Sequence, residues 1–274
     1  MHMIFLDFRE LFDASAFSVG IRIIKERELS FDRLYIGSSF CPIYFIFSDI
    51  YPKVFDYCSK EKLKISLSVP VFNESLLQQG KEKLCQLIEI GKGVIDEVLV
   101  NDIGMLRYVS ECLDVDVVLG RLFFKDPRDG RIPLFVERTA VFSLLTFPDF
   151  INQEKVIGIE LDPIADVLDL SAICDYHGIV TLNGPYCYMS VGMICKFGSV
   201  NKTVEKKFRP STRCGFECRN IIEIHSDRHY PLNKKLIRAG RAIFYYQPRV
   251  DTIGRLVDRH LYFPLYEFIQ YLKG

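Results

Sequence analysis

Short apolar runs alternate along the chain with segments whose apolar residues recur at helical spacing. Runs of β-branched and aliphatic residues predict strands, whereas recurrence every three to four residues predicts amphipathic helices. This alternation is typical of repeated β-α units that build a mainly parallel sheet. Six strands are expected on this basis, at residues 33–37, 64–71, 97–100, 115–119, 157–161 and 178–182.

Helices are predicted between these strands where an Asn or Asp precedes the apolar pattern, because such side chains accept hydrogen bonds from the first amides of a helix. The predicted helices are residues 75–90, 103–113 and 163–176, the last with Pro163 in its first turn. Beyond residue 220 the pattern predicts strands at 221–224 and 244–246, and helices at 234–241 and 265–272.

This order of elements predicts an α/β fold, a (β/α) barrel-like domain that is an incomplete or irregular TIM-type barrel. An open doubly wound sheet is the competing architecture. Small polar or reactive residues follow each strand, and in a barrel the loops after the strands build the site on one face. The same residue types end strands and cap helices, which is the commoner role at any single position.

Composition fits one large domain spanning residues 1–274. The chain has 49% apolar and 13% aromatic residues, enough for a sizeable core. The 35 basic and 35 acidic side chains balance, which gives no long-range attraction to nucleic acid or anionic membranes. The first ten residues lack the pattern of a signal peptide, and no apolar stretch is long enough for a membrane span. A cytoplasmic location without a membrane span is expected.

The segment 186–220 breaks the alternation and holds four of the nine cysteines, Cys187, Cys195, Cys214 and Cys218. An odd number of cysteines in a reducing compartment argues against a complete disulfide framework. Three others lie in helix-like apolar patterns and are expected in the core: Cys85, Cys112 and Cys174. The segment is therefore predicted to be an irregular, cysteine-rich, metal-binding part of the domain.

Cys214 and Cys218 form a C-x3-C pair, with Cys195 upstream and cationic residues directly beside the candidate ligands. Structural zinc sites usually combine two C-x2-C pairs, and no second pair is present here. Iron–sulfur clusters accept more irregular spacing and a ligand from a distant part of the chain. The spacing alone leaves four possibilities open: an iron–sulfur cluster, zinc, a redox thiol pair, or loop cysteines without such a role.

Several passages resemble the collagenase-like peptidase family "U thirty-two", especially its short, single-domain branch, the UbiV-like proteins of anaerobic ubiquinone biosynthesis. The passages are residues 34–41 (LYIGSSFC), 98–107 (VLVNDIGMLR), 119–128 (LGRLFFKDPR), 157–161 (IGIEL), 188–195 (YMSVGMIC) and the C-x3-C pair. The resemblance implies a four-iron four-sulfur (4Fe-4S) cluster, with zinc as the alternative. Its ligands would be Cys41, Cys195, Cys214 and Cys218, and Cys187 is the alternative to Cys195.

The resemblance also implies oxygen-independent hydroxylation of a ubiquinone precursor or an RNA base, together with a paralogous protein subunit in a heterodimer. Four strand-end residues are then expected to line the barrel mouth as catalytic groups: Asn101, Asp102, Arg121 and Glu160. Arg121 would pair with an anionic group of a small-molecule or RNA substrate, and Glu160 would handle a proton. Arg121 and Glu160 are equally able to form structural ion pairs inside the barrel.

Peptidase activity has little support, because the chain has neither a G-x-S-x-G nor an H-E-x-x-H motif and its five histidines are scattered. The alternative hypothesis is a non-catalytic, metal-stabilised subunit or an RNA-binding accessory protein. A basic run that would touch RNA comprises Lys202, Lys206, Lys207, Arg209 and Arg213, followed later by Lys234, Lys235, Arg238 and Arg241.

Overall fold

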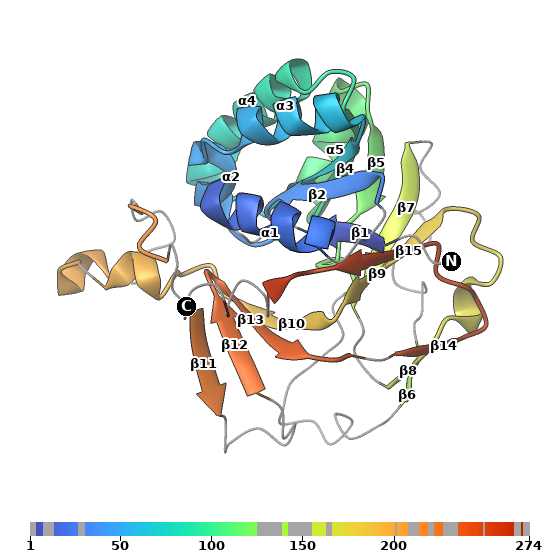
Figure 1. The fold of residues 1–274 in the computed structure, drawn as a ribbon. Helices are drawn as coiled ribbons and strands as arrows, with labels where there is room; N and C mark the ends of the chain where they lie inside the picture. Colours follow the sequence, from blue (N-terminus) through green and yellow to red (C-terminus); the bar gives the residue numbers. More distant parts are fainter. Residues whose placement is uncertain are drawn as a thin grey trace.

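The computed structural model describes residues 4–7, 14–26, 31–124, 139–141, 155–162, 166–200, 202–207, 214–218, 222–226, 235–248, 250–265 and 270. Within these ranges eight parallel strands close into a barrel in the order β1-β15-β9-β7-β5-β4-β3-β2 (Figure 1). Their bounds are β1 (Ile4–Asp7), β2 (Arg33–Gly37), β3 (Lys64–Val69), β4 (Ile95–Val100), β5 (Asp116–Leu119), β7 (Val156–Leu161), β9 (Ile179–Gly184) and β15 (Arg259–Tyr262).

Five described helices accompany the first half of the barrel, α1 (Ala14–Glu26), α2 (Pro42–Phe47), α3 (Tyr51–Glu61), α4 (Glu74–Ile90) and α5 (Ile103–Cys112). They pack on apolar side chains of β2 to β5, and strand residues such as Leu34, Ile65 and Val98 are fully buried in this layer. None of the described helices has both the length and the apolar character needed to cross a membrane.

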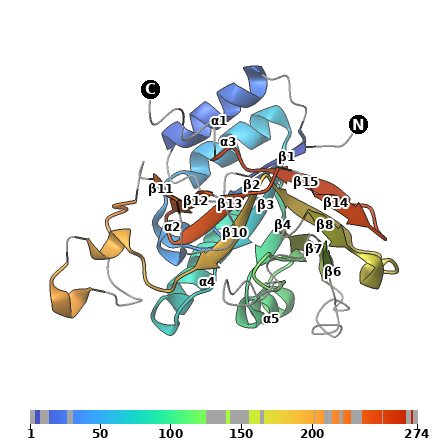
Figure 2. The same cartoon turned by 90° about the horizontal axis from the view of Figure 1, so that it is seen from below.

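The second half of the chain adds two smaller sheets in place of long helices. An antiparallel sheet has the order β10-β13-β12-β11, made of β10 (Tyr186–Val191), β13 (Ala242–Tyr246), β12 (Lys235–Ala239) and β11 (Ile222–Ser226). A short parallel sheet joins β14 (Asp251–Ile253), β8 (Val167–Asp169) and β6 (Thr139–Val141). Figure 2 shows the antiparallel sheet and the β14-β8-β6 sheet lying apart from each other beside the barrel.

Charged and hydroxyl side chains meet inside the barrel. The Arg259 guanidinium on β15 donates to Glu97 Oε1 on β4 (2.7 Å) and to the Tyr35 hydroxyl on β2 (3.1 Å). Ser66 on β3 donates to the same Glu97 oxygen, and Arg33 donates to Ser66. Since β15 and β4 are separated by several strands on either side of the barrel, the Arg259–Glu97 bond crosses its interior.

The barrel-like α/β fold confirms the main expectation from the sequence. All six predicted strands and the helices at 75–90 and 103–113 are present, with bounds shifted by no more than a few residues. The strand expected at 64–71 ends at Val69. β1 and β15 were not predicted from the sequence. Strands were also predicted correctly near 221–224 and 244–246, whereas the helix expected at 265–272 lies mostly outside the described residues.

Two helix predictions were wrong. The described part of 163–176 contains strand β8 and a single 3-10 turn at Ser171–Ile173, and residues 235–239 of the helix expected at 234–241 form β12. In β12, Leu236 and Ile237 are both buried, in two separate apolar clusters. A strand covered on both faces has consecutive apolar residues, and this pattern does not distinguish it from a helix.

The three cysteines expected in the core are exposed in the structure, namely Cys85, Cys112 and Cys174. Cys85 and Cys112 do lie on helices, α4 and α5, but on their outward-facing sides. Cysteine is a small side chain that a helix tolerates on either face, so its burial preference is too weak to decide a single position.

Replacing Arg259 by Ala is expected to lower the free energy of unfolding by about 3 kcal/mol, because the buried Glu97 would lose its shorter ion pair and keep the longer one to Arg33 (3.5 Å) and the Ser66 hydrogen bond. The free energy is measured by urea denaturation. Arg107→Ala is the matched control, because it removes an exposed i,i+4 pair with Glu111 and should leave the midpoint unchanged. Equal midpoints for the two variants would contradict the interior role of Arg259.

Candidate metal centre

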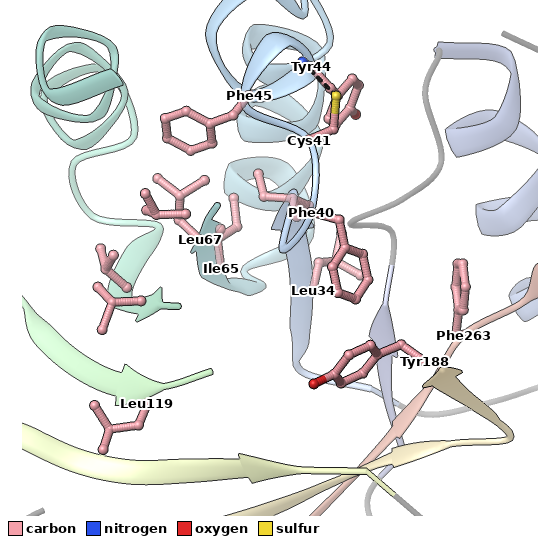
Figure 3. Close-up of a cluster of buried hydrophobic side chains, with 14 of the residues drawn as sticks. Leu34, Phe40, Cys41, Tyr44, Phe45, Ile65, Leu67, Leu119, Tyr188 and Phe263 are labelled. Atoms are coloured by element: carbon pink, nitrogen blue, oxygen red, sulfur yellow. Dashed lines mark hydrogen bonds between the residues drawn. The ribbon is translucent and has the colours of Figure 1, made fainter. Parts of the chain in front are cut away.

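Cys41 stands at the carboxyl end of β2, where the chain turns into α2. The Ser38 hydroxyl oxygen accepts hydrogen bonds from the amides of Phe40 (3.1 Å) and Cys41 (2.8 Å), which fixes this turn. The thiol of Cys41 caps α2 by accepting a bond from the Tyr44 amide (3.4 Å), shown as the dashed line in Figure 3. The barrel strand and the helix start together determine the position of this sulfur.

The other three candidate ligands lie after β10, in the segment that carries the antiparallel sheet. Cys195 precedes a 3-10 turn, η3 (Phe197–Ser199), and Cys214 and Cys218 lie in the described stretch 214–218. A Cβ atom added to Gly198 would lie 3.7 Å from Cys195 Cβ and 3.9 Å from Cys214 Sγ. Cys195 and Cys214 therefore both lie beside Gly198 and close to each other.

The Cys218 thiol lies within electrostatic reach of the other three candidate ligands. Burial raises the pKa of the Cys218 thiol, and the thiols of Cys41, Cys195 and Cys214 raise it further. Burial raises the pKa of Cys214 to about 11, and the neighbouring Glu217 and Cys195 contribute to this increase. Residues far apart in the chain, before α2 and after β10, are thus brought within electrostatic reach of one another.

Glu217 lies beside this group. Its carboxylate is 3.2 Å from Cys214 Sγ and accepts a hydrogen bond from the Gly215 amide (3.0 Å). Burial alone would raise the pKa of Glu217, but these hydrogen bonds and the charge of Lys202 lower it overall. The carboxylate was not singled out from the sequence, because a lone Glu between two cysteines carries no distinctive signal.

The remaining cysteines lie elsewhere. Cys187 is fully buried on β10 in a separate apolar cluster with Met189, Leu236 and Tyr245. Cys58 is fully buried on α3, and burial raises its pKa to about 12. Both are therefore suitable controls for the four grouped thiols.

An all-thiol group fits an iron–sulfur cluster, and it fits tetrahedral zinc equally well by donor type. In the part of the chain that the structure describes, no three His, Cys, Asp or Glu side chains already stand in a geometry that holds a metal ion. The raised pKa values of Cys214 and Cys218 favour the neutral thiols, and a bound metal would displace those protons.

Phe40 connects the thiols to the barrel mouth. Its ring packs against Tyr188 (5.3 Å between centroids) and Phe244 (5.8 Å) of the antiparallel sheet, and Figure 3 shows it between Cys41 and Tyr188. The Arg121 guanidinium lies over the rings of Phe40 (5.7 Å) and Tyr188 (5.4 Å). The antiparallel sheet therefore covers the carboxyl end of the barrel, next to Cys41.

Arg121 forms a buried ion pair with Asp162. Its Nε donates to Asp162 Oδ2 (3.0 Å) and its Nη2 to Asp162 Oδ1, and both side chains are almost fully buried. Asp162 was expected to cap a helix at 163–176, whose first residues lie outside the described part of the chain. Arg121 therefore has a structural partner, Asp162. The binding of a substrate anion by Arg121 stays a prediction.

Asn101 and Asp102 also have structural partners. Asn101 donates to the Val69 carbonyl (2.9 Å) and accepts from the Leu122 amide (3.4 Å), which ties three strand ends together. Asp102 caps α5 by accepting from the Met105 amide (2.8 Å), and burial raises its pKa. These hydrogen bonds give both residues a structural role at the strand ends. A catalytic role for Asn101 or Asp102 stays a prediction.

Glu160 is fully buried on β7, in register with Thr181 on β9. The pKa of Tyr35 is raised to about 12, chiefly by burial and by the charge of Glu97, and Glu160 adds to this effect. Glu160 thus belongs to the same interior as the Arg259 network. Its role as a proton carrier stays a prediction.

A double-mutant cycle tests whether Arg121 and Asp162 act mainly on each other. Arg121→Gln and Asp162→Asn should each lower the free energy of unfolding by about 3 kcal/mol, because each leaves the other charge buried without its partner. The double variant should lose clearly less than the sum of the two, measured by urea denaturation. Additive losses would show that Arg121 and Asp162 are not coupled and would leave Arg121 available for a ligand.

A comparison of the chain with protein-family models and with curated protein sequences gave no significant match. The resemblance to the collagenase-like peptidase family therefore remains a hypothesis carried by the motifs and by the grouped cysteines.

Proposed function

We propose that this chain is an iron–sulfur protein whose 4Fe-4S cluster is held by Cys41, Cys195, Cys214 and Cys218. One observation supports the proposal: Cys195 and Cys214 both lie beside Gly198, and the buried Cys218 lies within electrostatic reach of these two thiols and of Cys41, which are the ligands that the family resemblance implies. When bound, such a cluster supplies one-electron transfer. We also interpret the closed parallel barrel as a TIM-type barrel.

The proposed activity is oxygen-independent hydroxylation of a ubiquinone precursor or an RNA base, with a paralogous subunit as partner. The four thiols support this assignment by their position beside the carboxyl end of the barrel, where α/β barrels build their sites. The rings of Phe40 and Tyr188 lie between the four thiols and the buried Arg121 guanidinium. A cluster bound by these thiols would therefore be one aromatic layer away from a cation at the mouth of the barrel.

A second candidate is a metal-stabilised subunit without catalysis of its own. It is favoured by the structural partners found for Asn101, Asp102 and Arg121. In this case the cluster, or zinc, would hold the antiparallel sheet and the segment after β10 against the barrel. The reacting groups would then come from the partner subunit.

Iron, acid-labile sulfide and zinc should be measured on anaerobically purified protein. About four iron and four sulfide per chain are expected. Cys41→Ala and Cys214→Ala should lose most of the iron, whereas the matched controls Cys187→Ala and Cys58→Ala should retain it, because those thiols lie outside the group. Stoichiometric zinc in place of iron would favour the structural subunit, and iron retained by Cys41→Ala would contradict the ligand set.

Metal removal tests the structural role. A metal bound by Cys41 and by three cysteines within residues 195–218 would close a long loop of the chain. Removal of the metal should therefore release residues 195–218 from the barrel, while the barrel itself stays folded. Limited proteolysis should then cleave within residues 192–218 at least about tenfold faster, which corresponds to about 1.4 kcal/mol of lost local stability. An unchanged cleavage pattern would leave the metal without a structural role.

A further inference from the structure

The segment around Cys195 projects from the body of the molecule. It follows β10, contains η3 and η4 (Val204–Lys206), and appears in light orange at the left of Figures 1 and 2. Four of its large apolar side chains are exposed, namely Met193 (46%), Ile194 (40%), Val200 (60%) and Val204 (81%). Exposed apolar residues gathered on one segment mark an interaction surface more often than isolated ones do.

The same segment is positively charged. Described residues 192–207 include four lysines, Lys196, Lys202, Lys206 and Lys207, and one acidic residue, Glu205. Lys196 is paired with Glu223 on β11 (2.6 Å). Lys202 lies within electrostatic reach of Glu217, which contacts Cys214, so the positive charge extends to the edge of the thiol group.

This combination favours a protein partner over RNA. RNA-binding surfaces use exposed aromatic rings for base stacking, and the aromatic residue of this segment, Phe197, is buried. Methionine and aliphatic side chains flanked mainly by lysines are typical of a small protein interface with an apolar centre and a polar rim. The complementary partner would have an acidic rim.

We propose that residues 193–207 form the docking surface for a small acidic electron carrier. The inference rests on the proposed iron–sulfur function. A reduced iron–sulfur or flavin carrier would lose one electron and the cluster would gain it, with no bond made or broken. Electron-transfer complexes have small interfaces and rely on opposite charges to speed their encounter, which fits a surface of a few apolar side chains and several lysines.

The test uses a plant-type [2Fe–2S] ferredoxin, reduced anaerobically, as the acidic carrier. Stopped-flow absorbance follows electron transfer to the iron-loaded chain at low and high salt. Val204→Glu and Lys206→Glu should slow the second-order rate at least about tenfold, because each adds repulsion at the docking surface. The wild-type rate should fall as salt rises, since exposed charges are screened.

Leu256→Glu is the matched control, because Leu256 is as exposed (83%) as Val204 but follows β14, on the opposite side of Figure 1. It should leave the rate unchanged, and dithionite should reduce all variants equally. Equal ferredoxin rates in all variants would overturn the docking surface. So would a loss of binding to RNA or to anionic vesicles in Val204→Glu with an unchanged ferredoxin rate, because the surface would then serve that partner.

Cross-linking separates this inference from the proposed function. A carbodiimide joins ferredoxin carboxylates to nearby lysines without any need for a cluster. Cross-links at Lys202 or Lys206 are expected in the protein as purified, whether or not it contains iron. If the chain holds no iron but these cross-links form, the proposed function fails and the docking surface stands. Cross-links confined to lysines elsewhere, such as Lys60, would overturn the docking surface.

Discussion

The packing of Phe40 against the antiparallel sheet is the contact on which the site depends. Phe40 lies at the end of a barrel strand, and its ring meets Tyr188 and Phe244 on two strands of that sheet. The next residue is Cys41, and the segment beyond β10 supplies the other three thiols. Together with the contacts of Tyr188 with Arg121 and of Phe244 with Phe263, the packing of Phe40 fixes the antiparallel sheet on the barrel and so holds the segment after β10 near Cys41.

Much of the barrel could be predicted from the sequence, because parallel strands buried beneath helices have nearly continuous apolar runs. β15 was missed for the opposite reason. Its Arg259 faces a polar interior, so the strand lacks an apolar run. The helix expected at 163–176 was wrong in the described part, where residues 167–169 form β8 between β6 and β14. That pairing depends on strands far away in the sequence, which local patterns do not contain.

The candidate site, too, could be predicted only in part from the sequence. The ligand set came from the resemblance, and spacing alone left zinc and a redox pair open. The structure adds the electrostatic influence of Cys41 on Cys218 and places Cys187 in a separate cluster. The structural partners of Arg121 and Asn101 were beyond reach from the sequence, because they depend on which strand ends meet. Gly198 and Glu217 are relevant to the site because they lie beside the thiols, and this position is not visible in the sequence.

The most direct test of the iron–sulfur account is an anomalous difference map at the iron absorption edge, from crystals grown and frozen without oxygen. The account predicts one strong peak enclosed by the sulfurs of Cys41, Cys195, Cys214 and Cys218, with sulfur–iron distances typical of thiolate ligation. A peak that responds at the zinc edge alone would contradict the redox cluster. A map with no peak among these four sulfurs would contradict the metal centre itself.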